Sequence, residues 1–71
     1  MTRTVEITKE PVELYKILKF EGLVGTGGEA KIMISDGQVT VNGEIETRRR
    51  KKIVDGDVIE FREDIMQIRL A

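Results

Sequence analysis

The chain has 71 residues, enough for one small domain with a thin core. It contains no Cys, His or Trp, which excludes disulfides, thiolate or imidazole metal sites, and Cys or His nucleophiles. Twelve Lys and Arg against thirteen Asp and Glu give a formal net charge of −1, a sum that is not typical of a nucleic-acid binder. Ile and Val supply 16 of the 28 apolar residues, which favours a sheet over an all-helical bundle.

The near-neutral sum conceals a segregation of charge along the chain. Residues 48–52 are five consecutive cations, whereas residues 55–71 carry two basic and five acidic residues. The longest apolar runs, such as residues 32–34, are far shorter than the ~20 residues of a membrane helix, and the first residues lack the apolar region of a signal peptide. We therefore expect a cytoplasmic protein that does not enter a membrane.

The first half of the chain predicts a strand followed by two helices. Apolar residues alternate with polar ones over residues 5–7, which indicates a short strand. Pro11 suits a first helical turn, the apolar spacing of residues 14–18 continues that helix, and Gly22 can end it.

The second helix has the clearest start signal, a capping box from Thr26 to Glu29. Ala30, Met33 and Ile34 share one face of the predicted helix, and Gly37 is its expected stop. Lys31 lies about 100° from that apolar stripe. It is therefore expected to point toward solvent or a partner.

After Gly37 the apolar spacing changes from a helical to a strand period. Asn42-Gly43 is a strong hairpin signal, because both positions tolerate the positive φ of a type I′ turn. Strands are predicted around this turn and, after an Asp-Gly-Asp turn, in the last third of the chain, at residues 39–41, 44–46, 58–61 and 65–70. The order β-α-α-β-β-β-β predicts a single α+β domain over residues 1–71.

Two motifs that could indicate phosphate binding or acid–base catalysis lack features that those functions require. The Gly25–Gly28 loop is followed by Glu29-Ala30 instead of the Lys and Ser or Thr of a phosphate-binding loop. The carboxylate pairs Asp55 with Asp57 and Glu44 with Glu46 have no predicted apolar pocket that would separate their pKa values. We therefore expect no catalytic residue, no metal, no cofactor and no enzymatic activity.

The basic run, defined here as residues 48–52, is the one constellation that stands out. In an extended segment Arg48, Arg50 and Lys52 would share one side, and Arg is suited to bidentate phosphate contact. A solvated charged segment without a partner is the alternative interpretation. Phe20 and Phe61 are both predicted in the core, so contacts to a phosphate backbone fit better than stacking on bases.

Four groups of residues together resemble a known family, the alpha-L RNA-binding domain of ribosomal small-subunit protein S-four type. They are residues 26–31, Ile34, residues 37–43 and residues 56–59, and the resemblance covers residues 14–61. The opening of the second helix and the basic run most resemble small stand-alone bacterial members, in which this domain is the whole protein.

The resemblance implies two N-terminal helices packed on a small curved, mostly antiparallel sheet. It also implies a monomer that binds structured RNA, with ribosomal RNA, transfer RNA or a ribosome-assembly intermediate as candidates, through phosphate-backbone and shape contacts of the second helix and the neighbouring basic run. The positions that the resemblance assigns to RNA are Lys31, Arg48, Arg49, Arg50, Lys51, Lys52 and Gln38.

The same resemblance leaves Asn42-Gly43 a structural role. It also has one departure, because the family helix often opens with Ser-Arg where this chain has Thr26-Gly27. The missing Arg shifts the expected phosphate contacts toward the basic run.

Two alternatives use the same residues. Residues 41–44 and 55–60 are also similar to small sulfur-carrier β-grasp proteins, but those need a Gly-Gly C-terminus where this chain has Leu70-Ala71. A protein-interaction module that docks an acidic partner on the basic run is the other alternative.

Overall fold

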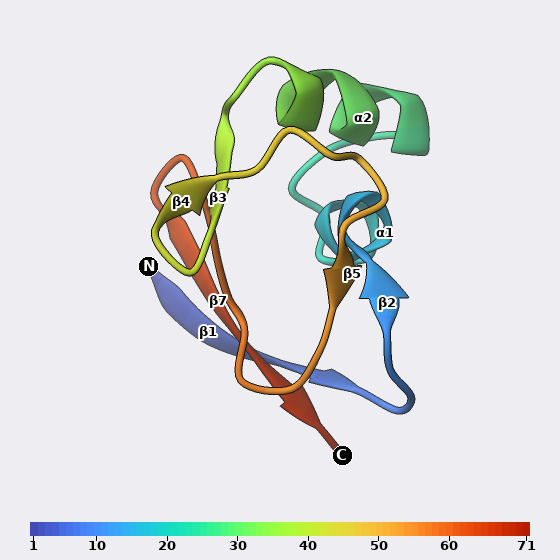
Figure 1. The fold of residues 1–71 in the computed structure, drawn as a ribbon, viewed down its shortest axis with the longest axis vertical. Coiled ribbons are helices and arrows are strands. Elements are labelled where there is room, and N and C mark those ends of the chain that lie inside the picture. Colours follow the sequence, from blue (N-terminus) through green and yellow to red (C-terminus); the bar gives the residue numbers. More distant parts are fainter.

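The computed structural model describes residues 1–71, which form two helices and seven strands (Figure 1). In chain order the elements are β1 (Thr2–Ile7), β2 (Val12–Glu13), α1 (Leu14–Phe20), α2 (Gly27–Ser35), β3 (Val39–Val41), β4 (Glu44–Ile45), β5 (Lys52–Ile53), β6 (Val58–Phe61) and β7 (Asp64–Leu70). Neither helix has the length and apolarity needed to cross a membrane.

Five strands form the main sheet in the order β1-β7-β6-β3-β4, and β2 pairs with β5 in a separate two-stranded sheet. β1 runs parallel to β7, with which it overlaps in the view of Figure 1, and every other pair is antiparallel. The predicted α+β fold, with two helices and a mostly antiparallel sheet, is confirmed.

The predicted element order, β-α-α-β-β-β-β, lacks the two short strands β2 and β5. Pro11 was expected in the first helical turn, but α1 begins three residues later because Val12 pairs with Ile53 and Glu13 with Lys52. A two-residue strand is specified by its distant partner and not by its own spacing. The β2–β5 pairing matters for the site, since it brings the end of the basic run to the start of α1.

The turns that local chemistry specifies form as predicted. Asn42 and Gly43 have φ values of 53° and 86° in the hairpin between β3 and β4, as a type I′ turn requires. Gly22 and Gly37 follow the two helices at φ 73° and 80°, a left-handed conformation that glycine adopts without steric cost.

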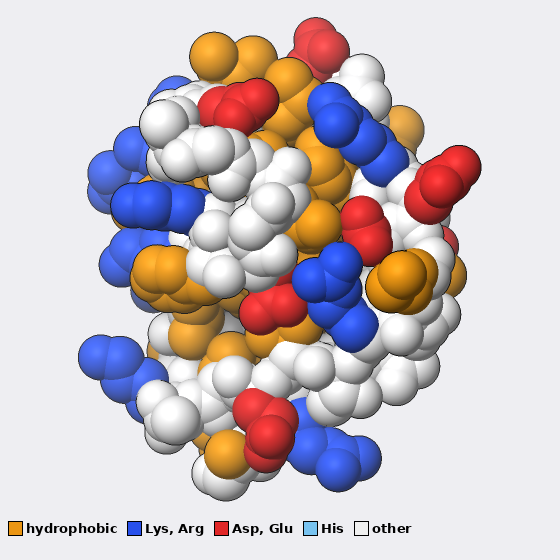
Figure 2. Space-filling model, turned by 180° about the vertical axis from the view of Figure 1, so that it is seen from behind, with side chains coloured by type: hydrophobic (Ala, Val, Ile, Leu, Met, Phe, Trp, Pro, Cys, Tyr) orange, Lys and Arg blue, Asp and Glu red, His pale blue; other side chains and the backbone are white.

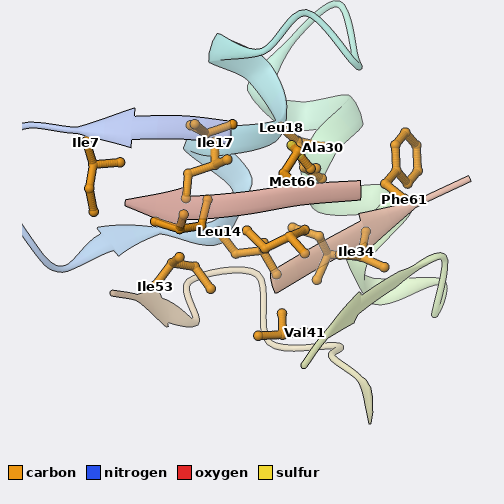
Figure 3. Close-up of a cluster of buried hydrophobic side chains, with 14 residues drawn as sticks. Ile7, Leu14, Ile17, Leu18, Ala30, Ile34, Val41, Ile53, Phe61 and Met66 are labelled. Carbon is orange, nitrogen blue, oxygen red and sulfur yellow. The ribbon is translucent and has the colours of Figure 1, made fainter. Parts of the chain in front are cut away.

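The core consists of 14 buried side chains, all of them hydrophobic, contributed by both helices and both sheets. Figure 3 shows how residues of α1 and α2 gather against those of the strands. Phe61 is buried as predicted, but the prediction for Phe20 is wrong, since 71% of that residue is exposed. The buried face of α1 is formed by Leu14, Ile17 and Leu18, and Phe20 lies roughly 110° around the helix from the centre of that face.

Candidate nucleic-acid interface

The basic run is a turn and not an extended segment. The Lys51 N–H donates to the Arg48 carbonyl at 3.1 Å, so the predicted alternation of Arg48, Arg50 and Lys52 along one side is wrong. The chain must reverse here to reach the β2–β5 pairing, and only Lys52 belongs to a strand.

The backbone of the basic run holds the start of α1. The Leu14 N–H donates to the Lys51 carbonyl at 2.9 Å, and the Tyr15 N–H donates to the Arg49 carbonyl at 3.2 Å. The first N–H groups of a helix have no partner inside it, and the residue before α1, Glu13, provides no side-chain cap. The carbonyls of the basic run replace that cap, which fixes the run against the helix, and four of its five residues are exposed.

Lys31 is held against the same helix by an aromatic ring. Its ammonium lies 4.7 Å from the centre of the Tyr15 ring, a favourable cation–π distance. Gly27, one turn earlier on α2, faces the same ring, because a Cβ built there would lie 3.7 Å from the ring carbons. Tyr15 therefore contacts Lys31 through its side chain and the basic run through its backbone.

The start of α2 is capped much as the sequence predicts. The Glu29 N–H donates to the Thr26 hydroxyl at 3.0 Å. The Glu29 carboxylate accepts from the Gly25 N–H at 2.7 Å, one residue before the cap that it was expected to reach. This carboxylate occupies the helix N-terminus, so the nearby cations and not the glycine loop offer sites for an anion.

An open cleft of about 420 Å³ lies between α2 and the basic run. Lys31 and Arg49 both line it, together with Gly28, Ile32, Ser35 and Asp36. Neither Lys31 nor Arg49 has an acidic partner among the ion pairs of the structure. The cleft thus presents two cations without ion-pair partners, from segments 18 residues apart in the sequence, to a common space. Its one acidic lining residue, Asp36, accepts a hydrogen bond from the Gln38 amide.

Arg48 and Arg50, in contrast, are paired with carboxylates. Arg48 donates from Nε and Nη2 to the two oxygens of Glu46, at 2.9 and 3.1 Å. These hydrogen bonds lower the pKa of Glu46 and raise the pKa of Arg48. Arg50 lies 3.8 Å from Glu13, a longer contact on an exposed side chain. The charge of Arg48 is thus balanced before any ligand arrives, whereas Arg50 shares the Glu13 carboxylate with Lys16, which lies closer to it at 3.3 Å.

The remaining predicted site residues lie outside the Lys31–Arg49 cleft. Lys51 is half-buried and lines a neighbouring hollow with Arg48. Lys52 is exposed on β5. The Gln38 amide donates to the Asp36 carboxylate at 3.4 Å, beyond the end of α2. The seven predicted residues therefore do not converge on one point.

Sequence reasoning missed Tyr15. It directly follows Leu14 and is one of the three aromatic residues of the chain. Nothing in its local spacing links it to Lys31 or Arg49. That link is made by the packing of α1 against α2 and by the β2–β5 pairing.

The fold and the order of these motifs define an alpha-L domain, and residues 5–69 match the S4 domain family. The chain belongs to this family, which confirms the resemblance found in the sequence. Among its relatives is YbcJ of Escherichia coli strain K12, 46% identical over 66 residues that cover 92% of this chain and 94% of YbcJ. A protein of Bacillus subtilis strain 168, named a probable ribosome maturation protein, RlbA, is 37% identical over 61 residues, 86% of each chain.

A solved structure confirms the fold independently. The solution structure of Escherichia coli YbcJ superposes with a TM-score of 0.71 at 45% identity, covering 93% of this chain and 85% of that one. That structure is described as an alpha-L motif involved in RNA binding.

Proposed function

We propose that this chain is a non-enzymatic RNA-binding protein of the cytoplasm that holds structured RNA by its phosphate backbone. The observation that carries the proposal is the cleft in which Lys31 and Arg49 stand without acidic partners. Adjacent Lys51 and Lys52 extend the positive charge along the basic run. The names of the relatives, YbcJ with its RNA-binding motif and RlbA in ribosome maturation, support ribosomal RNA or an assembly intermediate as the ligand.

In this proposal the fold supplies rigidity and the side chains supply charge. The Arg49 and Lys51 carbonyls are fixed by the start of α1, and the Lys31 ammonium is fixed by the Tyr15 ring. Less conformational entropy is lost on binding when the cations are positioned in advance. Phosphate contacts made this way recognise backbone shape and not base sequence.

Gln38 would contribute less to RNA binding than the cations do. Its amide is exposed and already donates to Asp36. It would contribute one hydrogen bond at the rim of an RNA ligand that extends past the end of α2.

The test is equilibrium binding of the wild type to a ribosomal RNA hairpin and to transfer RNA at several salt concentrations. If about three phosphates are neutralised, log K should fall against log salt with a slope of about −2 to −3. Replacing Lys31 and Arg49 together by Ala should weaken binding about tenfold and flatten the slope by about two. No binding to either RNA, or binding without salt dependence, would contradict the proposal.

The matched control removes two charges elsewhere. Arg62 and Arg69 lie on the β6–β7 turn and on β7 and have no acidic partner. Replacing both by Ala changes the net charge equally and should alter RNA affinity less than about twofold. A comparable loss in this control would mean that total charge, and not the cleft, governs binding.

A further inference from the structure

Phe20 is an exposed aromatic side chain beside a groove. It is the last residue of α1 and is 71% exposed. The groove, of about 550 Å³, runs between β1 and α1, and its apolar wall includes Val5, Ile7 and Ile17. A flat ring at the border of an apolar groove offers a stacking surface that no other part of the chain occupies.

The groove is continuous with the proposed RNA surface. Lys16 lines the groove and lies one helical turn from Phe20 on the same face of α1. The Lys16 ammonium is also 6.0 Å from the Tyr15 ring, over which Lys31 lies. Glu13, another lining residue, contacts both Lys16 and Arg50, at 3.3 and 3.8 Å. A strand of RNA that leaves the Lys31–Arg49 cleft along α1 would therefore reach Phe20.

Charges of both signs surround the groove, and the cations that could meet an anionic ligand are those without an acidic partner. Three acidic residues line it, but Glu13 is paired as described and Glu21 is paired with Arg3 at 3.4 Å, which leaves Glu6. Lys9 in the lining and Lys19 on α1 have no acidic partner. Figure 2 shows Lys and Arg side chains along the left edge of that view, the edge that carries α1 and α2 in Figure 1.

We propose that Phe20 stacks against an unpaired nucleobase of the RNA, while Lys9 and Lys19, which have no acidic partner, neutralise the adjoining phosphates. An apolar face combined with flanking cations matches a nucleotide, which joins an aromatic base to an anionic phosphate. The ligand class is thus a structured RNA that carries a bulged or otherwise unpaired nucleotide beside a helical segment. This inference rests on the proposed function.

The test compares two RNA hairpins that differ by one bulged adenosine in an otherwise identical stem. The wild type should bind the bulged RNA about tenfold more tightly than the paired RNA, a typical gain for one base stacked on an aromatic ring. Phe20→Leu, which keeps an apolar side chain, should abolish most of this preference while leaving affinity for the paired RNA unchanged. Phe20→Trp should retain it.

Phe20→Trp also provides a direct readout, because the chain has no other Trp. Its emission should be quenched by the bulged RNA and much less by the paired RNA. Gln67→Trp is the matched control, since Gln67 is exposed on β7 between the core residues Met66 and Ile68 and so lies on the opposite face of the sheet from the core. Its emission should respond equally to both RNAs.

The outcomes separate the two proposals. If the wild type binds neither RNA, the proposed function fails and this inference fails with it. If the wild type binds both RNAs equally, or Phe20→Leu keeps the preference, RNA binding stands and the stacking site is overturned. If Phe20→Leu changes only the sedimentation of the free protein, the groove binds a second copy of the chain and the stacking site is likewise overturned.

Discussion

The basic run, which ends in β5, and the acidic turn, residues 55–57, which follows that strand, use charge in opposite ways. In the acidic turn the carboxylate of Asp57 accepts from the Val54 N–H at 2.9 Å and from the Asn42 amide at 3.0 Å. This carboxylate is engaged by one backbone and one side-chain donor, which join the acidic turn to the residue after β5 and to the Asn42 hairpin. The acidic side chains of this turn therefore stabilise the fold.

In the basic run the backbone of Arg49 and Lys51, and not their side chains, is bonded to the rest of the fold. The carbonyls of Arg49 and Lys51 accept from the start of α1, and neither side chain has an acidic partner. The comparison explains why a formal net charge of −1 is compatible with a polyanion as ligand. Several carboxylates are engaged in structural hydrogen bonds, whereas part of the positive charge is held in place and left uncompensated.

The largest expected effect is a loss of stability when the acidic turn is altered. Asp57→Ala should lower the free energy of unfolding by about 2 kcal/mol, because two hydrogen-bond donors lose a charged acceptor. Urea denaturation measures this, and RNA affinity under conditions where the protein stays folded should not fall. Glu63→Ala removes the same charge from an exposed residue whose side chain has no partner and should cost less than about 0.5 kcal/mol. Equal destabilisation by Asp57→Ala and Glu63→Ala would show that the hydrogen bonds of Asp57 do not stabilise the fold.

The next effect adds charge beside the basic run. Gly27 has an ordinary backbone conformation, and a Cβ there would make only van der Waals contact with Tyr15. Gly27→Arg should therefore fold, bind RNA about fivefold more tightly and steepen the salt slope by about one. Gly27→Ala is the control without the charge. A gain of the same size in the Ala variant would assign the effect to the helix and not to a phosphate contact.

A smaller effect is expected from loss of the ring under Lys31. Tyr15→Leu should weaken RNA binding about threefold, because a cation–π contact at an exposed site contributes roughly 0.5–1 kcal/mol. Tyr15→Phe keeps the ring and should bind as the wild type does in the same titration. If the Phe variant is as weak as the Leu variant, the hydroxyl and not the ring supports binding.

These variants probe features that differ in how far the sequence predicts them. The hairpin at Asn42-Gly43, the Thr26 cap and the stops at Gly22 and Gly37 are predictable, because a few adjacent residues determine each backbone conformation. The order of motifs also identifies the family and marks Lys31 and the basic run as candidates.

The geometry of the site is not predictable in the same way. The turn within the basic run depends on the β2–β5 pairing, and the position of Lys31 depends on Tyr15, 16 residues away. The ion pair of Arg48 with Glu46 is local, but five consecutive cations give no signal of which one is compensated. Phe20 was misassigned because a large aromatic residue at the end of a helix can face either way.

The smallest expected effect is on the free energy of unfolding, through the ion pair of Arg48 with Glu46 at the start of the basic run. Arg48 lowers the pKa of Glu46 below its ordinary value of 4.5, so the stability that Glu46 contributes is present above that value and is lost as the pH falls through the folded pKa. Wild type should therefore exceed Glu46→Gln in urea midpoint at pH 7, and the two should converge once the pH has fallen below the folded pKa of Glu46. A difference between them that persists at low pH would contradict the ion pair as its source.

The measurement that tests the central claim compares two double variants that remove two positive charges each. Lys31→Ala with Arg49→Ala removes uncompensated cations of the cleft, whereas Arg48→Ala with Arg50→Ala removes cations paired with Glu46 and Glu13. In one salt titration against the same RNA hairpin, the first should lose about tenfold in affinity and about two units of slope, and the second less than about threefold. Equal losses in the two variants would contradict the account.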